Sequence, residues 1–383
     1  MKKLIVALAV ASVVTAASAA TYDGVYVSGL QKSFFIADAG QTTFNVAAGI
    51  QFDPNSQVGG VYDKLYAVNR SAANAKRGLY SIDIINETTS ARLALAGDSS
   101  NDLDSPSDVA IDSSGNAYVP YGGVPSVWKV ADPSGTPVES QMLGNYGTAG
   151  DDDMYGIDMV PAGFGGGYAS DSDVIIYDGG FNDNDHNAVT VVDSTSTVGT
   201  PLYTTIWSEA NLNSIRGATS SYEGKVYISH WTLDLDDLGG TTNAYVLRLD
   251  NAGNTERIFL DIDPDLVPKL DDAITVNPED GSLWMNIETA DTTRDVIRVD
   301  VVNAADQGGG DFLASTTVVI EDLGYNVGAY SMAFSPDGEQ LALGAPDVQD
   351  RLFVYDIIPE PATIGLFGIL GVAMLWIRRK FTV

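Results

Sequence analysis

The sequence has no cysteine, only two histidines and few basic residues, and each shortage excludes a class of chemistry. Without cysteine, the 383-residue chain can form no disulfide, carry no lipid anchor on cysteine and use no cysteine nucleophile. With His186 and His230 as the only histidines, a histidine-rich metal site or a serine–histidine triad is hard to assemble. No G-x-S-x-G element of a serine hydrolase occurs either.

Basic residues are scarce in the body of the chain. Against 51 acidic residues stand 20 basic ones, which gives a formal net charge of −31. Five of the basic residues lie near the two ends, so the body between them is more acidic still: Lys2, Lys3, Arg378, Arg379 and Lys380. Such a field repels nucleic acid and anionic membrane surfaces. The partners that it permits are cations, basic proteins and neutral glycans, and it also favours solubility in an exterior of variable salt.

The N-terminal segment has the three parts of a secretory signal peptide. Lys2 and Lys3 supply the positive charge, an apolar run extends over residues 4–14, and small residues lead to Ala17 and Ala19. The sequence therefore predicts a signal helix over residues 1–19, cleavage after Ala19 and export of the rest. Residues 20–357 are then the exported body.

The C-terminal segment, residues 358–383, predicts a membrane anchor. Its basic residues follow the apolar stretch, whereas those of the signal peptide precede it. Pro359, Glu360 and Pro361 precede an apolar stretch over residues 362–377, and the basic stub over residues 378–380 follows it. At about 1.5 Å per residue, this stretch is a short transmembrane helix, about 24 Å long against a hydrocarbon core of about 30 Å. Arg378, Arg379 and Lys380 would stop transfer and stay cytoplasmic, leaving the body outside.

This order of motif, apolar helix and basic stub resembles the PEP-CTERM sorting tail of Gram-negative bacteria. The resemblance covers Pro359 to about Lys380, and it implies that Pro359, Glu360 and Pro361 form the recognition element. It also implies processing near the motif by an exosortase, a membrane-embedded cysteine transpeptidase-like enzyme, in a host that makes exopolysaccharide. An ordinary tail anchor that begins with the same three residues is the alternative.

The body repeats a turn followed by a short apolar strand. Glycines that can supply the positive φ of a tight hairpin turn precede four of these strands: Gly115, Gly224, Gly281 and Gly338. A further strand in each unit ends in aspartate, which is typical of a turn that the carboxylate caps. These aspartates are spaced 45 to 61 residues apart: Asp38, Asp83, Asp132, Asp193, Asp250, Asp300 and Asp356.

A period near 50 residues with three or four strands in each unit predicts an all-β chain folded as a six- or seven-bladed β-propeller. Seven units favour seven blades. The first unit lacks a clear innermost strand and the last lacks an outermost one, so the two ends could instead share one blade. The strands around Pro106–Val119 resemble those of NHL and gluconolactonase-like propellers.

In a propeller, ligands meet the residues at which the innermost strands begin, at the mouth of the central channel. The repeat places five candidates there: Asp108, Tyr155, Arg216, Asp272 and Tyr330. They predict a polar, aromatic funnel suited to a glycan or a peptide, and they lack the convergent carboxylates and amides of a lactonase-type calcium site.

One acidic segment has the oxygen spacing of a calcium loop. Asp183, Asp185 and Asn187 alternate as at the start of an EF-hand, but Ala188 and Ser194 stand where that motif needs glycine and glutamate. The sequence requires no cofactor. If one binds, Ca²⁺ is the cofactor that this segment would accommodate. A solvated loop is the simpler interpretation of this segment.

These features predict a non-catalytic binding or structural module of the envelope or extracellular matrix. An exosortase-like enzyme and exopolysaccharide are its predicted partners, together with the membrane before processing, whereas nucleic acid is not one. Two alternatives stay open: a secreted metal-dependent propeller hydrolase of lactonase type, and a calcium-dependent adhesion protein.

Overall fold

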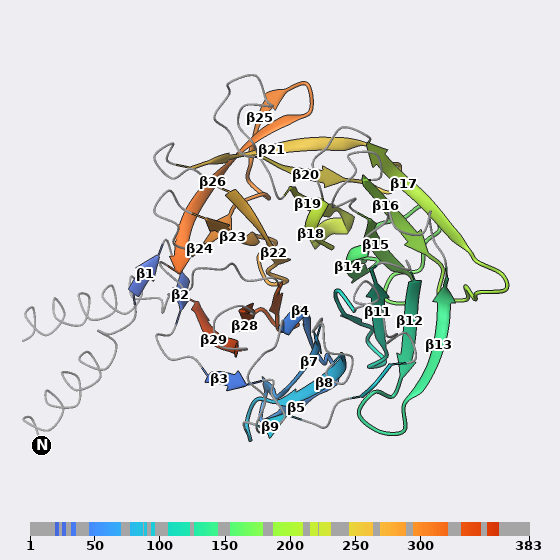
Figure 1. Ribbon diagram of the computed structural model, residues 1–383. Helices are drawn as coiled ribbons and strands as arrows, with labels where there is room; N and C mark the ends of the chain where they lie inside the picture. Colours follow the sequence, from blue (N-terminus) through green and yellow to red (C-terminus); the bar gives the residue numbers. More distant parts are fainter. Residues whose placement is uncertain are drawn as a thin grey trace, which may run out of the picture.

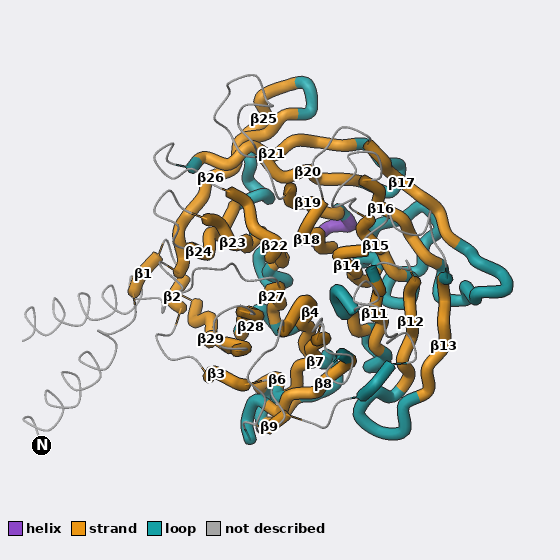
Figure 2. The backbone as a smooth tube through the Cα atoms, in the orientation of Figure 1, coloured by secondary structure: helices purple, strands orange, loops and turns teal. Residues whose placement is uncertain are grey.

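A computed structural model gives the fold. It describes residues 20–22, 25–27, 32–35, 46–69, 77–86, 88–89, 93–95, 106–122, 126–144, 154–178, 187–209, 215–220, 222–230, 245–262, 269–288, 294–320, 331–345 and 351–359. Within these ranges the chain is almost entirely β-strand, and the one helical element is a 3₁₀ turn at Tyr222–Gly224 (Figure 2). The predicted signal peptide lies outside the described ranges, as do Glu360 and the residues that follow it.

Three sheets each contain four strands in sequence order. The first is formed by β4 (Val46–Phe52), β7 (Lys64–Asn69), β8 (Gly78–Asp83) and β9 (Thr88–Thr89). The second is formed by β10 (Ala110–Ile111), β11 (Ala117–Tyr121), β12 (Ser126–Ala131) and β13 (Val138–Leu143). The third is formed by β14 (Met154–Met159), β15 (Val174–Asp178), β16 (Asn187–Val192) and β17 (Tyr203–Glu209).

A nine-stranded sheet follows, and it joins two antiparallel runs. One run is β18 (Ile215–Ser220), β19 (Val226–His230), β20 (Tyr245–Leu249) and β21 (Thr255–Asp261). The other is β22 (Lys269–Val276), β23 (Leu283–Glu288), β24 (Arg294–Val299) and β26 (Asp311–Ile320), with β25 (Ala305–Gly308) on its edge. The runs meet because β21 and β26 pair in parallel, and Arg257 binds Asp311 across that junction through two hydrogen bonds of 2.8 Å.

The last large sheet combines the two ends of the described chain. It contains β27 (Ser331–Phe334), β28 (Gln340–Ala345), β29 (Arg351–Pro359), β1 (Ala20–Tyr22), β2 (Val25–Val27) and β3 (Lys32–Phe35). The N-terminal strand β3 pairs with the first half of β29, and β2 pairs with its last three residues. A small hairpin of β5 (Gln57–Val58) and β6 (Val61–Tyr62) completes the described strands.

The sheets surround a central axis in a propeller-like arrangement (Figure 1). The innermost strands contact one another in a closed ring, in the order β4, β10, β14, β18, β22 and β27, with β27 returning to β4. The all-β, propeller-like architecture predicted from the repeat is thus confirmed.

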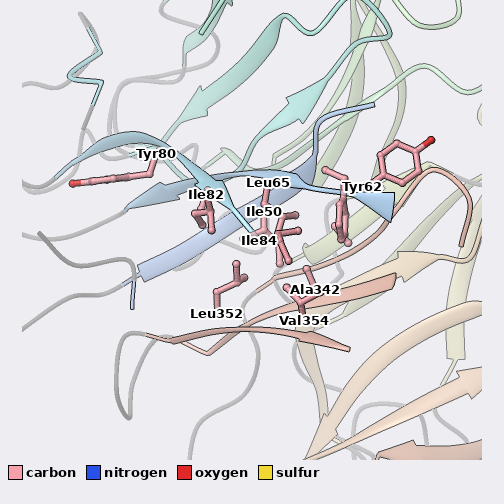
Figure 3. Close-up of a cluster of buried hydrophobic side chains, with 12 residues drawn as sticks. Ile50, Tyr62, Leu65, Tyr80, Ile82, Ile84, Ala342, Leu352 and Val354 are labelled. Carbon is pink, nitrogen blue, oxygen red and sulfur yellow. The ribbon is translucent and has the colours of Figure 1, made fainter. Parts of the chain in front are cut away.

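The hydrophobic core lies between neighbouring sheets. Figure 3 shows one such cluster, in which Leu65 and Ile82 of the first sheet pack near Leu352 and Val354 of β29. Leu65, Ile82 and Leu352 have no exposed surface. Since burying one such side chain contributes about 1.5–3 kcal/mol, the contact between the first and last sheets is a large part of what closes the ring.

The repeated turns behave as the sequence predicts, with one exception. All four turn glycines have positive φ, between 71° and 81°: Gly115, Gly224, Gly281 and Gly338. The aspartates that follow the third strands accept hydrogen bonds from the turn backbone, for example Asp83 from Asn86 at 2.7 Å and Asp250 from Ala252 at 2.9 Å. Asp356 is the exception, because β29 continues past it to Pro359. Asp38 lies outside the described residues.

Candidate functional site

An open cavity of about 290 Å³ lies among the innermost strands of the ring. Every innermost strand contributes to its wall. The polar wall residues include Gln51, Asp158, Thr219 and Thr275, and the apolar ones include Phe52, Ile111, Val276 and Phe334. A small cavity with a few polar groups in an apolar wall is typical of a ligand site, and it is our candidate functional site.

Four of the five predicted mouth residues lie on or next to the innermost strands. Asp108 lies two residues before β10, whereas Tyr155, Arg216 and Asp272 lie within β14, β18 and β22. Asp272 is three residues past the start of its strand, because β22 begins earlier, at Lys269. Tyr330 is outside the described residues, and for Tyr155, Arg216 and Asp272 the structure describes the backbone.

A break in strand pairing marks the level of these mouth residues. In β14 the register shifts between Met154 and Gly156, on either side of Tyr155. In β18 it shifts between Ile215 and Ala218, and in β22 between Leu270 and Ile274, which encloses Arg216 and Asp272 respectively. The innermost strand β4 has a corresponding shift between Val46 and Gly49. Bulges of this kind interrupt a ladder and re-aim side chains, and they are frequent beside functional sites.

Asp108 is tied to two neighbouring strands. Its carboxylate accepts the backbone N–H of Val109 at 2.8 Å and that of Ile157, on β14, at 3.0 Å. A Cβ added to Gly49 would lie 2.2 Å from Oδ1 of Asp108, so the carboxyl group occupies the space that the missing side chain of β4 leaves. Burial raises the pKa of Asp108 well above its ordinary value, and the charge of Asp158 raises it further, against the two backbone donors.

Asp158 makes the equivalent connection one sheet further round the ring. Its carboxylate accepts the backbone N–H of Met159 and the hydroxyl of Thr219, on β18, both at 2.8 Å. The repeat did not identify Asp158 or Thr219 as site residues. The available signal was a charged residue inside the otherwise apolar strand of residues 154–159.

Tyr177 adds a buried phenol to this group. Its side chain is 1% exposed, and among the described residues no hydrogen-bond partner lies within reach of its hydroxyl. Burial raises the pKa of Tyr177 well above its ordinary value, and the charges of Asp158 and Asp108 raise it further. Sequence reasoning missed this residue, because a tyrosine in an apolar strand is usually core.

The candidate calcium ligands are described only in part. Asn187 begins β16 and is 1% exposed, while Asp183 and Asp185 fall outside the described ranges. Within those ranges, no three acidic or histidine side chains converge closely enough to hold a metal ion. The same ranges contain no helix that is long and apolar enough to cross a membrane.

The sequence matches no family model, and no curated protein matches it. The solved structures that resemble the fold include three with a TM-score of 0.52. Regucalcin of Agrobacterium tumefaciens, a calcium-binding protein, is 14% identical, over 86% of this chain and 95% of that one. A gluconolactonase of Xanthomonas campestris is 15% identical, over 89% and 96%. The PQQ domain of a pyranose dehydrogenase of Coprinopsis cinerea is 10% identical, over 88% and 98%. At these identities the likeness concerns the fold alone, and it agrees with a β-propeller.

Proposed function

We propose that this chain is an exported, six-bladed β-propeller, sorted to the cell envelope or extracellular matrix by its C-terminal tail, which binds exopolysaccharide without catalysis. Six blades follow from the closed ring of innermost strands if β3 serves as the outermost strand of the blade formed by β27, β28 and β29. The predicted first unit, which ends at Asp38, would then be part of the last blade.

The first and last described strands lie next to the two proposed processing signals. The first described strand begins at Ala20, directly after the predicted signal cleavage, and β29 ends at Pro359, the first residue of the proposed sorting motif. The predicted boundary at residue 357 falls inside this strand. The described strands therefore lie between the two proposed cleavage positions, and the last of them reaches the first residue of the motif.

The observation that carries the binding function is the set of bulged innermost strands around the polar cavity. The register shifts in β14, β18 and β22 coincide with the predicted mouth residues. The cavity is lined by later residues of the same strands, such as Asp158, Thr219 and Thr275, and no predicted mouth residue is among the described residues that line it. Asp158 in the cavity wall and the net charge of −31 disfavour anionic ligands, so a neutral glycan fits best.

A hydrolase is the second candidate, and Asp108 is the reason. A buried carboxyl group whose pKa is raised well above its ordinary value can act as a general acid, and the charge of a second carboxylate, Asp158, raises that pKa further. The lactonase-type alternative would use these two residues. A calcium-dependent adhesion protein rests on Asp183, Asp185 and Asn187 alone.

The test uses the native protein recovered from its host and size-fractionated exopolysaccharide of the same host. Saturable binding in calorimetry, with no new reducing ends or released acid after prolonged incubation, is the expected result. Release of product would favour the hydrolase. Absence of binding, with and without Ca²⁺, would overturn the proposed glycan function.

A further inference from the structure

The carboxyl group of Asp108 lies where three innermost strands meet. It accepts the backbone N–H of Val109, in its own sheet, at 2.8 Å and that of Ile157, on β14, at 3.0 Å. On a third side stands Gly49 of β4, whose added Cβ would lie 2.2 Å from Oδ1, 2.3 Å from Cα and 2.6 Å from the carbonyl carbon of Asp108. One residue thus fills the junction of the first three sheets, and we call this junction the Asp108 seam.

The strands beside the Asp108 seam have interrupted ladders. The strand β10 contains only two residues, and Asp108 lies ahead of both. In β4 the register shifts just before Gly49, and in β14 it shifts between Met154 and Gly156. An interrupted ladder leaves a segment with less backbone support, so such a segment opens more readily than the middle of a sheet.

The charges around the seam do not favour an ionised Asp108. Burial is the main reason that its pKa is raised, and the charge of Asp158 raises it further, against the two backbone donors. The strands β4 and β10 contain no titratable residue. Those of the neighbouring strands β11, β14 and β15 are acids or phenols: Tyr118, Tyr121, Tyr155, Asp158, Tyr177 and Asp178. A carboxylate formed in the closed seam would therefore have no cation from these strands, and a buried ion without a paired charge is unfavourable.

We propose that Asp108 is a proton-dependent latch, whose neutral carboxyl group holds the first three sheets together and whose ionisation lets the seam open. Asp108 and Tyr155 are also predicted mouth residues, so an open seam changes the entrance of the channel. The inference concerns the ring itself and holds whether or not the channel binds a glycan.

The direction of the pH effect follows from proton linkage. In the closed seam the pKa of Asp108 is above its ordinary value of 3.8, whereas contact with water in the open seam restores that value. As the pH rises above about 4, the open state therefore binds fewer protons than the closed one, and its population grows by up to about tenfold per pH unit. The growth stops when the pH reaches the pKa of Asp108 in the closed seam.

The experiment uses the absence of cysteine from the chain, so that one introduced thiol reports on one place. Val109→Cys puts the thiol in the seam, where the side chain is buried. Val296→Cys puts it in the buried part of β24, in a distant sheet, and reports unfolding of the whole ring. Val198→Cys gives an exposed thiol, whose rate corrects for the effect of pH on the labelling chemistry. Labelling by dithionitrobenzoate is followed at several pH values, with aspartate and with asparagine at position 108.

We expect the corrected labelling rate of V109C to exceed that of V296C by at least about tenfold. The V109C rate should rise with pH and then level off. In the D108N background the corrected rate should not depend on pH, because asparagine does not titrate. A merely structural role of Asp108 would leave the rate without a pH slope in both backgrounds.

Two results would overturn the latch. One is an equal corrected rate for V109C and V296C, since the seam would then open only with the whole ring. The other is the same pH dependence of the V109C rate with aspartate and with asparagine at position 108. If V109C does not fold, Ser107→Cys is the second reporter, because cysteine is close to serine in size and Ser107 is buried, with its hydroxyl donating to the carbonyl of Met154 across the same seam. None of these outcomes involves a glycan, so the proposed function is decided by its own test.

Discussion

Val25 and Pro359 face each other as register partners in the antiparallel pair of β2 and β29. One lies just after the predicted signal cleavage and the other at the start of the proposed sorting motif. The earlier part of β29 pairs with β3, whose Phe35 is the partner of Arg351. The two ends of the described chain therefore close the ring together, and neither end can be altered without consequence for the other.

Loss of the β3 pairing should open the ring. Ser33 and Phe34 pair with Phe353 and Leu352, and successive residues of a strand direct their N–H groups to opposite sides. Replacing both by proline removes at least one ladder hydrogen bond and should lower the free energy of unfolding by about 1–3 kcal/mol. Thermal melts measure the change.

The control for this variant is Ser33→Ala, which keeps both backbone groups and should melt as the parent does. If the double proline variant also melts unchanged, β3 does not contribute to closure, and the assignment of β3 to the last blade would be wrong.

Gly49 should tolerate no side chain. In Gly49→Ala the new Cβ would lie 2.2 Å from Oδ1 and 2.3 Å from Cα of Asp108, so backbone as well as side chain must move. We expect a loss of at least about 2 kcal/mol in the free energy of unfolding, measured by denaturant titration. Gly199→Ala is the matched control, because nothing lies within 4 Å of its added Cβ, and it should change stability by less than about 0.5 kcal/mol.

Asp108 should give the protein a distinctive pH dependence. Its pKa is raised above the ordinary value of 3.8, chiefly by burial. At low pH both folded and unfolded states hold the proton. As the pH rises above about 4, Asp108 ionises only in the unfolded state. The free energy of unfolding therefore falls until the pH reaches the pKa of Asp108 in the folded state.

Asp108→Asn tests this sign. Asparagine does not titrate, and its NH₂ group would face one of the two backbone donors, so the variant should melt below the parent at pH 4. The difference in melting temperature should narrow as pH rises to 8. A difference that stays constant over this range would contradict a raised pKa at Asp108.

The sequence predicted the architecture because the repeat is local. Turn glycines such as Gly281 and strand-ending aspartates such as Asp250 act within a few residues, so their spacing marks each unit. The sequence left the number of blades open between six and seven. It depends on pairing between β3 and β29, more than 300 residues apart in the chain, and no local pattern records that.

The candidate site was predictable only at its rim. Innermost strands could be aligned by the repeat, which placed Tyr155 and Arg216 at the level of the bulges. The sequence did not predict the inner polar group, because it is assembled across sheets. Asp158 accepts a hydrogen bond from Thr219, which is 61 residues away in the chain. The ring of Tyr177 lies in the space that a side chain at Gly156 would occupy, and this contact appears only in three dimensions.

The most direct test of the account is the intact mass of the native protein from its host. The account predicts a chain that begins at or next to Ala20 and ends at Pro359 or within the next few residues, which keeps the pairing of β2 with β29. A mass that still includes the basic stub and the residues up to Val383 would contradict removal of the tail by a sorting enzyme. Retention of Met1 would contradict export by a cleaved signal peptide.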